Sequence, residues 1–441
     1  MWDRIIEKFK NKNIAILGFG REGISTYKFL RRYLNEKITI LDKNESIKEN
    51  DIFNGDNNVS FVLGDSYMDS LDDYDIIVKS SGISLNHMDN ASFIDKVVSQ
   101  YSLLLEDTDL FVIGITGTKG KSTTSTLLYD VIKDQNPNTV LMGNIGIPFF
   151  DMVDQINKDT IIVSEFSAYQ LELIKKAPHI SILLNLYEEH LDYFGSKEKY
   201  FNSKLNILKK QNSNDYGFYL KDNKEYIKDI KSTLFEVKSD IYMECDFIYF
   251  KDEKLYNIND KRNLLGNHNL TNIMFVLGVV KLLNLDIEKA TKVINNFKGL
   301  EHRMEYVGTY FDIKFYNDTI ATIPTATINA IETLKDVDTL IFGGMDRGID
   351  YTSLIEYLST SNINNLICMP ETGTKIGNIL KENTNKNIYF TDDMKEAVLL
   401  AKEHTEKGKI CLLSPAAPSY NKYKNFEEKG KDYKNIIKKT I

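Results

Sequence analysis

A glycine-rich segment between an apolar run and an amphipathic stretch carries the clearest chemical signal in the sequence. Its residues are Gly117, Thr118, Lys119, Gly120, Lys121, Ser122 and Thr123. Glycines let backbone N–H groups turn toward phosphate oxygens, and the start of the following helix adds partial positive charge. Lys121 is spaced to reach the β- and γ-phosphates and Ser122 to offer its hydroxyl to Mg²⁺, although Ile115 replaces the first glycine of the strict pattern. The segment predicts a nucleoside triphosphate site.

Acidic residues and one histidine follow the next two predicted strands, 161–164 and 180–185. Ligands of open α/β sheets bind at the carboxyl ends of the strands, so we expect Glu165 beside the triphosphate, where it can coordinate Mg²⁺. The segment 188–192 adds three carboxylates and His190, which suit a second Mg²⁺; the alternative is a solvated acidic loop. Lys204 lies on a predicted helix, where most lysines are solvent-exposed, so its residue type alone assigns it no role.

Asn269 and Asn272 lie three residues apart, on one face of a further predicted helix. Each carboxamide offers both a donor and an acceptor, as the edge of an adenine requires. Asparagine also favours helix starts, so the alternative is that the two residues cap the helix.

The N-terminal glycines Gly18, Gly20 and Gly23 also follow a predicted strand, and Asp42 ends the next one. This pattern matches the dinucleotide-binding fingerprint, in which an acidic residue binds a ribose hydroxyl. The same glycines serve close helix–strand packing with any ligand. The pattern therefore predicts a diphosphate-containing ligand, of which a nicotinamide cofactor is one candidate.

Polar loops in the last third of the chain are expected at strand ends. Arg303 suits phosphate, which a guanidinium binds through two hydrogen bonds, although surface salt bridges are the commoner role of such residues. Thr322 lies between a predicted strand at 310–316 and a helix with Pro in its first turn, a position that favours an anion. Arg347 and Ser419 lie in two further loops, and together these residues would line a carboxylate site.

The surrounding sequence alternates short apolar runs with amphipathic stretches, which is typical of parallel βαβ units and an α/β fold. Three such units are expected, with boundaries near residues 105 and 300, and the chain length of 441 fits about three domains. The region 212–262 has alternating patterns that predict an antiparallel excursion.

Composition excludes several classes of protein. A net charge of −8 argues against a nucleic-acid scaffold, and three scattered cysteines argue against a disulfide framework or a zinc site. The first 13 residues lack the apolar run of a signal peptide, and no stretch reaches the roughly 18 apolar residues of a membrane span. We expect a cytoplasmic protein that is a monomer, with no nucleic-acid partner.

Five runs of residues resemble the ATP-dependent Mur ligases of peptidoglycan synthesis, and the resemblance covers essentially the whole chain. They are TGTKGKSTT (Thr116–Thr124), SEFSAYQLE (Ser164–Glu172), NLYEEHLD (Asn185–Asp192), GNHNLTN (Gly266–Asn272) and EHRMEYV (Glu301–Val307). Five others resemble the family members that add D-glutamate to UDP-N-acetylmuramoyl-L-alanine: GFGREG, SSGIS, GNIGIP, GGMDRGIDY and LLSPAAPSYNKYKNFEEKG. The resemblance implies a Rossmann-like N-terminal domain, a central P-loop mononucleotide-binding domain and a C-terminal Rossmann-like α/β domain.

The resemblance also implies the substrates and the residues that bind them. The substrates are ATP with Mg²⁺, the UDP-sugar peptide and D-glutamate, which react through an acyl phosphate. The residues implied for the UDP-substrate are Gly18, Gly20, Asp42, Gly82, Asn144 and Ser167. Those implied for ATP are the segment Gly117–Thr123 with Asn269, Asn272, Arg303 and Asp318, and those for D-glutamate are Thr322, Arg347, Ser419 and Phe426. Lys121 would neutralise the phosphate charge, and the metal ligands would be Ser122, Glu165, His190 and a carbamylated Lys204.

The sequence departs from the family pattern at four positions. Glu189 replaces an aspartate, Ile320 a lysine, Arg347 a lysine and Ser81 a proline. The loss of the lysine at Ile320 leaves open a second hypothesis, a ligase of the same type that adds a different amino acid. Two hypotheses of other classes are a nicotinamide oxidoreductase and a catalytically silent UDP-sugar-binding protein.

Overall fold

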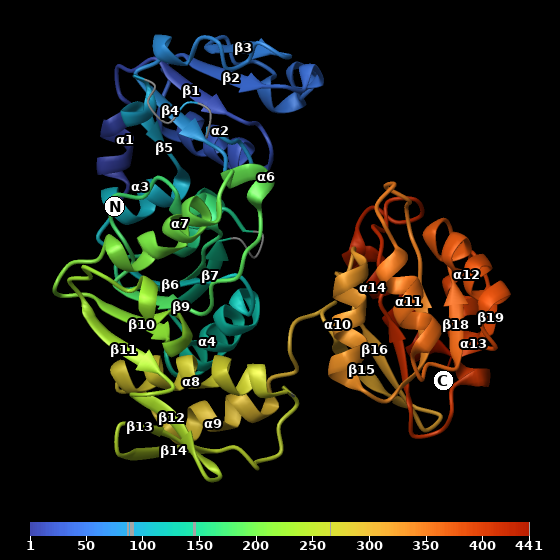
Figure 1. The fold of residues 1–441 in the computed structure, drawn as a ribbon. Coiled ribbons are helices and arrows are strands. Elements are labelled where there is room, and N and C mark those ends of the chain that lie inside the picture. Colours follow the sequence, from blue (N-terminus) through green and yellow to red (C-terminus); the bar gives the residue numbers. More distant parts are fainter. Residues whose placement is uncertain (86–87, 89–91, 144–146, 265, 441) are drawn as a thin grey trace. The chain divides into compact units, whose positions relative to one another are not determined.

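The computed structural model describes residues 1–85, 88, 92–143, 147–264 and 266–440. The chain divides into two compact units, Met1–Asn296 and Phe297–Ile441. Two sheets lie in the first unit and one in the second (Figure 1). This confirms the predicted α/β class, since helices alternate with parallel strands in all three sheets.

The first sheet has the strand order β3-β2-β1-β4-β5, and all its strands are parallel. Its strands are β1 (Ile14–Leu17), β2 (Ile38–Asp42), β3 (Val59–Leu63), β4 (Ile76–Lys79) and β5 (Val97–Val98). The helices of this part are α1 (Asp3–Phe9), α2 (Arg21–Tyr33) and α3 (Gln100–Asp107). The strand predicted before Gly18 is β1, and the strand predicted to end at Asp42 is β2.

The second sheet has the order β14-β13-β12-β11-β10-β9-β6-β8-β7. Its strands are β6 (Phe111–Thr116), β7 (Thr139–Gly143), β8 (Ile161–Glu165), β9 (Ile180–Leu183), β10 (Tyr216–Leu220), β11 (Thr233–Val237), β12 (Ile241–Glu244), β13 (Phe247–Phe250) and β14 (Glu253–Asn257). Its helices are α4 (Lys121–Gln135), α5 (Ala168–Leu171), α6 (Leu191–Phe194), α7 (Lys197–Lys209), α8 (Asn267–Leu282) and α9 (Ile287–Asn296). The prediction for 212–262 is wrong in part: β12, β13 and β14 are antiparallel, but β10 and β11 extend the parallel sheet beside β9.

The third sheet has the order β15-β16-β20-β17-β18-β19 and is parallel except for the pair β15–β16. Its strands are β15 (Glu305–Tyr310), β16 (Ile313–Asn317), β17 (Val337–Phe342), β18 (Asn365–Cys368), β19 (Asn387–Phe390) and β20 (Ile410–Leu413). Its helices are α10 (Pro324–Leu334), α11 (Thr352–Thr360), α12 (Thr372–Asn383), α13 (Met394–His404) and α14 (Phe426–Lys439). The strand predicted at 310–316 is confirmed as β16 but begins later, at Ile313, because Phe311 and Asp312 adopt φ values of +55° and +67° in the turn of a hairpin with β15.

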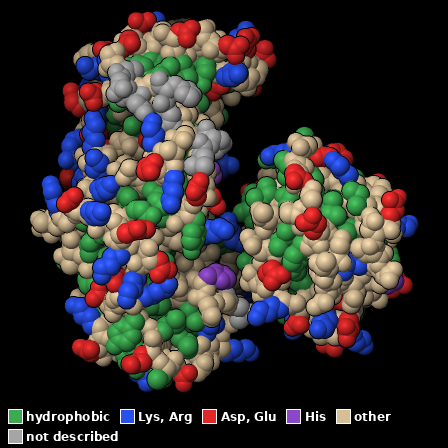
Figure 2. All heavy atoms as spheres, viewed as in Figure 1, with side chains coloured by type: hydrophobic (Ala, Val, Ile, Leu, Met, Phe, Trp, Pro, Cys, Tyr) green, Lys and Arg blue, Asp and Glu red, His purple; other side chains and the backbone are tan. Residues whose placement is uncertain are grey.

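The first two sheets share a hydrophobic core, which explains why contacts group them in one unit. Phe29 of α2 stacks on Phe150 of the short 3₁₀ segment Phe149–Gln155, with ring centroids 4.0 Å apart. Strands such as β1 and β9 are buried along their whole length, as expected for parallel strands covered on both faces. None of the described helices has the length and apolarity needed to cross a membrane. Figure 2 shows basic and acidic side chains interspersed over the visible face.

Candidate active site

The glycine-rich segment joins the end of β6 to the start of α4, as predicted. Gly120 has a φ of +86°, and a Cβ there would lie 2.9 Å from Oδ1 of Asn272, so backbone conformation and a close neighbour both favour glycine. Lys121 is the first residue of α4, and its Nζ donates a hydrogen bond to the carbonyl oxygen of Thr118 at 2.9 Å. Backbone N–H groups at a helix start and an adjacent lysine form a site suited to phosphate.

The segment after β9 fixes the conformation of this loop. The backbone N–H of Thr118 donates to the carbonyl oxygen of Asn185 at 2.9 Å, and the N–H of Lys119 donates to Asn185 Oδ1 at 2.8 Å. Asn185 Nδ2 in turn donates to the Lys119 carbonyl oxygen at 2.9 Å. The Asn185–Asp192 segment and the phosphate loop are therefore held together, as the strand-end argument predicted.

Lys204 is a buried residue of α7 that lies against the loop. Its Nζ donates to the carbonyl oxygen of Gly117 at 2.8 Å and lies 4.9 Å from the ring centroid of Tyr200. Burial lowers the pKa of the Lys204 ammonium to about 7, helped by the charge of Lys121 and opposed by Glu189 and Glu165. The general expectation of an exposed helix lysine therefore does not hold at this position.

Glu165 ends β8 and is 1% exposed, next to the strand that leads into the phosphate loop. His190 lies after β9 with a φ of +57°, and its side chain is 47% exposed. Its ring makes edge contacts with the rings of Tyr169 and Tyr200. In the described part of the chain, no three His, Cys, Asp or Glu side chains are placed to hold a metal by themselves. One or two such ligands are typical of Mg²⁺, which takes its other ligands from phosphate oxygens, hydroxyls and water.

Asn269 and Asn272 are buried in the first turns of α8, and Asn272 Nδ2 donates to Asn269 Oδ1 at 3.1 Å. The N-cap of α8 is Gly266, so the alternative that the two asparagines cap this helix is wrong. The contact between Asn272 and Gly120 places this helix face directly beside the phosphate loop.

The N-terminal glycine turn and Asp42 also come together. The N–H of Phe19 donates to Asp42 Oδ2 at 2.6 Å, and Ser80 Oγ donates to the carbonyl oxygen of Gly18 at 2.7 Å. A Cβ on Gly23 would lie 2.2 Å from that same carbonyl oxygen, so α2 approaches the turn closely. Gly20 is the N-cap of α2, and Gly82 follows Ser80 in the adjacent turn.

Asn144 and Ser167 are two further residues predicted to contact the UDP-substrate. Asn144 lies outside the described residues. Ser167 is the N-cap of α5, where it forms a capping box with Gln170. This gives its hydroxyl a structural partner, and a substrate contact at Ser167 stays a prediction.

In the second unit, Arg303 and Asp318 lie near each other at the start of the third sheet. Asp318 accepts hydrogen bonds from Ser414 Oγ at 2.8 Å and from the backbone N–H of Met304 at 3.1 Å. Burial raises the pKa of Asp318 to about 6, although both hydrogen bonds and the charge of Arg303 oppose this. The Arg303 Nε atom is buried and has no hydrogen-bond partner among the described residues.

The four residues predicted for the amino acid come from loops and helix starts of the second unit. Ser419 is 2% exposed, and its Oγ has no hydrogen-bond partner within the described ranges. Arg347 is exposed, with its guanidinium carbon 5.9 Å from the ring centroid of Tyr420. Thr322 lies two residues before α10, and Phe426 is the first residue of α14. A buried hydroxyl without a partner is what a ligand-binding position predicts.

Sequence reasoning missed two residues at these sites. Tyr200 lies four residues before Lys204 on α7, and its hydroxyl is 3.4 Å from Thr118 Oγ1; the four-residue spacing was the available signal. His302 is 3% exposed and bonds Asn317 through Nδ1 at 3.0 Å. Its neighbour Arg303 was predicted instead.

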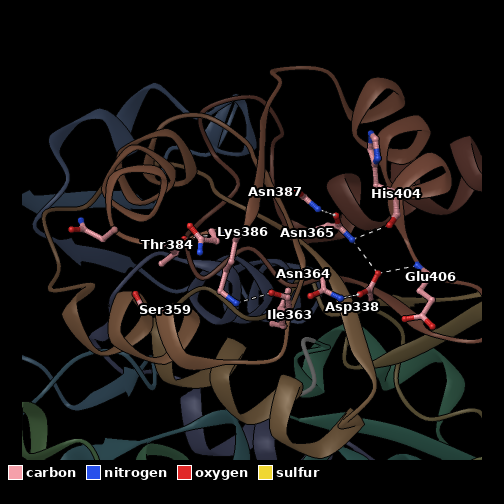
Figure 3. A pocket seen from close by; sticks show the side chains of 12 residues that line it. Asp338, Ser359, Ile363, Asn364, Asn365, Thr384, Lys386, Asn387, His404 and Glu406 are labelled. Carbon is pink, nitrogen blue, oxygen red and sulfur yellow. Dashed lines mark hydrogen bonds between the residues drawn. The ribbon is translucent and has the colours of Figure 1, made fainter.

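A cavity of about 530 Å³ lies elsewhere, at the amino-terminal ends of β17, β18 and β19 (Figure 3). Asp338 there accepts hydrogen bonds from the side chains of Asn364 and Asn365 and from the N–H of Glu406. These groups hydrogen-bond one another, so they already have structural partners. The cavity also lies at the amino-terminal edge of the sheet, opposite to the edge where ligands of such sheets bind.

Comparison with known families identifies the chain along most of its length. The Mur ligase MurD-like N-terminal domain matches residues 12–99, the Mur ligase middle domain matches 115–280, and the Mur ligase glutamate ligase domain matches 302–417. A protein of Clostridioides difficile (strain 630) described as UDP-N-acetylmuramoylalanine–D-glutamate ligase is 33% identical over 97% of this chain and 98% of its own length. A protein of Clostridium tetani (strain Massachusetts / E88) with the same description is 31% identical over 97% of each chain.

Solved structures with the same fold are also ligases of this kind. The MurF ligase of Thermotoga maritima in complex with ADP has a TM-score of 0.55 at 16% identity, covering 99% of this chain and 98% of its own. The UDP-N-acetylmuramate-alanine ligase MurC of the same organism has a TM-score of 0.59 at 15% identity, covering 98% of this chain and 100% of its own. At these identities the structures establish the fold alone. Given the near-full-length relatives above 30% identity, the chain belongs to the Mur ligase family.

Proposed function

We propose that this chain is an ATP-dependent ligase that adds D-glutamate to UDP-N-acetylmuramoyl-L-alanine during peptidoglycan precursor synthesis. The observation that carries the proposal is the similarity, over nearly the whole chain, to relatives described as this enzyme. The phosphate loop with Glu165 and Lys204 beside it supports the ATP-dependent half of the reaction.

The reaction has two steps. A carboxylate oxygen of the muramoyl-alanine attacks the γ-phosphorus of ATP, the bond from that phosphorus to the bridging oxygen breaks, and ADP leaves. The amine of D-glutamate then attacks the acyl carbon, loses a proton, and expels phosphate from the tetrahedral intermediate. The first step brings a carboxylate toward the negatively charged triphosphate, so Lys121 and the loop N–H groups are proposed to stabilise the transferring phosphoryl group.

The proposed binding residues are those that the resemblance to the family implies. Asn269 and Asn272 bind adenine beside the loop, Arg303 binds phosphate, and Asp318 binds the ribose. The UDP-substrate binds at the Gly18 turn with Gly20, Asp42, Gly82, Asn144 and Ser167. D-Glutamate binds at Thr322, Arg347, Ser419 and the backbone near Phe426. We further propose three domains, 1–105, 106–300 and 301–441, which bind the UDP-sugar, ATP and the amino acid in turn.

The donor set beside the loop fits Mg²⁺, with a buried carboxylate at Glu165, the hydroxyl of Ser122 and the imidazole of His190. Lys204 completes the set as a carbamate, because the neutral amine that burial favours is the form that combines with CO₂ to give an anion and a proton. When bound, Mg²⁺ would neutralise charge on the phosphate oxygens. We also propose that the protein is cytoplasmic, where ATP is available, and a monomer.

Phosphate release from ATP and Mg²⁺ with UDP-N-acetylmuramoyl-L-alanine, across a panel of D- and L-amino acids, tests the proposal. We expect release that requires D-glutamate. A requirement for another amino acid would assign the chain to a different ligase of the family and would point to Ile320. Absence of release with every amino acid would support the silent UDP-sugar-binding protein instead.

A further inference from the structure

Lys79 is a buried lysine that the proposed chemistry does not use. It is the last residue of β4, directly before the turn 80–83, and its side chain is 3% exposed. Its Nζ donates to the hydroxyl oxygen of Tyr193 at 3.2 Å and lies 3.7 Å from Glu172 Oε2. Burial lowers the pKa of Lys79, and the carboxylate of Glu172 opposes this. A buried cation is costly without partners, so these contacts determine where the side chain lies.

Tyr193 connects this lysine to the segment that carries His190. Its hydroxyl donates to the carbonyl oxygen of Ile83 at 2.8 Å. Its ring makes an edge contact with Tyr169 at 4.4 Å between centroids, and Tyr169 in turn lies 5.4 Å from the ring of His190. A continuous row of contacts therefore runs from the 80–83 turn to His190.

The other end of the turn is fastened to the glycine turn and α2. Ser80 Oγ donates to the carbonyl oxygen of Gly18 at 2.7 Å, and the N–H of Ser81 donates to Glu22 Oε2 at 2.8 Å. Glu22 also accepts a hydrogen bond from Gln170 Nε2 at 3.2 Å. The turn is thus held from both sides by groups of the first and second sheets.

We propose that Lys79 and Tyr193 are positioning residues that hold the 80–83 turn in its substrate-binding conformation and link it to the His190 segment. The inference rests on the proposed function, which places the UDP-substrate at this turn. A tyrosine hydroxyl has one proton. Because Lys79 donates to the hydroxyl oxygen, that proton is left for an acceptor. Two acceptors lie within reach, the carbonyl oxygen of Ile83 at 2.8 Å and Glu172 Oε2 at 3.2 Å, and the nearer one belongs to the turn.

The role differs from that of a core residue. The apolar core shared by the two sheets supplies the packing of this unit, and the hydroxyl of Tyr193 adds no apolar contact to it. Tyr193→Phe removes the hydrogen bonds and keeps the ring contacts with Tyr169 and Phe194. We therefore expect this variant to fold and to change substrate binding specifically.

The test measures KM for all three substrates, and calorimetric binding of UDP-N-acetylmuramoyl-L-alanine without ATP, in Tyr193→Phe and Lys79→Met. We expect KM and Kd for the UDP-substrate to rise about tenfold or more, the effect of losing a hydrogen bond to a charged group, with KM for ATP within about twofold of the unmodified value. Lys79→Arg keeps a donor and should restore part of the affinity. The double variant should bind about as weakly as the single variants, because the two residues act through one contact.

Two matched controls isolate the effect. Lys133→Met is the control for Lys79→Met. Like Lys79, Lys133 lies near a tyrosine ring and donates a hydrogen bond, in this case to the carbonyl oxygen of Thr139 at the start of β7. Tyr219→Phe removes a hydroxyl bonded to Glu236 on β11. Both should leave the UDP-substrate KM unchanged.

Unchanged affinity in Tyr193→Phe and Lys79→Met, or losses that simply add in the double variant, would overturn the inference. If Lys79→Met does not fold, the comparison of Tyr193→Phe with Tyr219→Phe decides alone. The proposed function would be contradicted if the unmodified protein bound the UDP-substrate but showed no D-glutamate-dependent release of phosphate. In that case the binding data of the variants would still decide the inference about Lys79 and Tyr193.

Discussion

The side-chain nitrogen of Lys204 lies 2.8 Å from the carbonyl oxygen of Gly117, so a buried amine of α7 contacts the phosphate loop directly. Burial and the charge of Lys121 lower the pKa of Lys204 to about 7, far below the usual range of a lysine. Near neutral pH a large fraction of this amine is therefore unprotonated. Only an unprotonated amine reacts with CO₂, so the burial of this amine supports the carbamate proposed for the metal site.

We predict that activity depends on dissolved CO₂. D-Glutamate-dependent phosphate release should fall roughly tenfold after exhaustive dialysis into CO₂-free buffer and return on addition of bicarbonate. Lys204→Met should lose about 10²–10³-fold in kcat, because an electrostatic group beside the transferring phosphoryl is removed. Lys209→Met, on the same helix but exposed and bonded to Asn202, is the control. Full activity that persists without CO₂ would contradict the carbamate.

A second prediction concerns Lys121. Lys121→Met should reduce kcat for phosphate release about 10²–10³-fold while calorimetric binding of the UDP-substrate stays unchanged, because the lysine lies in the phosphate loop and not at the Gly18 turn. Lys133→Met, later on the same helix, should keep its activity. Unchanged ATP turnover in Lys121→Met would show that the catalytic assignment is wrong.

Much of the framework could be predicted because short-range signals specify it. The apolar runs of β1 and β6, each followed by glycines and an amphipathic stretch, predict both the strands and the turns at their ends. The capping box of Ser167 and Gln170 was also readable, since Ser and Gln stand three residues apart at a helix start. A substrate role was predicted for Ser167 instead, and that role remains untested.

Other features depend on contacts that no local pattern specifies. The burial of Lys204 results from packing of α7 against a loop 87 residues earlier in the chain. β10 pairs in parallel with β9, and α7 separates these two strands in the sequence. Alternation of apolar and polar residues alone could not distinguish this pairing from an antiparallel hairpin. A positive φ, such as the +55° of Phe311, is rare for an aromatic residue. The residue types therefore gave no indication of the turn between β15 and β16.

Ser419 allows a test of the proposed amino-acid site that separates binding from folding. Its Oγ is buried without a hydrogen-bond partner in the described part of the chain, so Ser419→Ala removes an uncompensated polar group. We expect unchanged or slightly raised thermal stability, together with a KM for D-glutamate raised about tenfold and an unchanged KM for ATP. Lower stability with an unchanged KM for D-glutamate would show that Ser419 serves the fold and not the substrate.

Asp318 gives a prediction of pH dependence. Burial raises its pKa from 3.8 to about 6 in the folded protein. Between these values the unfolded chain has released the proton and the folded chain still holds it, so the contribution of Asp318 to stability falls as pH rises through this range and levels off above about 6. A shift of about two units corresponds to roughly 3 kcal/mol at most.

Asp318→Asn should therefore raise the melting temperature, most strongly above pH 6 and least near pH 4. Phosphate release should fall, because the proposed ribose contact is lost. Calorimetric scans of both proteins from pH 4 to 8 measure the difference. Asp350→Asn is the control of opposite sign, because hydrogen bonds from Thr352 lower the pKa of that exposed carboxylate. Its effect should be a small destabilisation that does not change between pH 5 and 8. A melting-temperature difference for Asp318→Asn that is the same at pH 4 and pH 8 would contradict the prediction, because it would show that burial does not raise the pKa of this carboxyl above that of the unfolded chain.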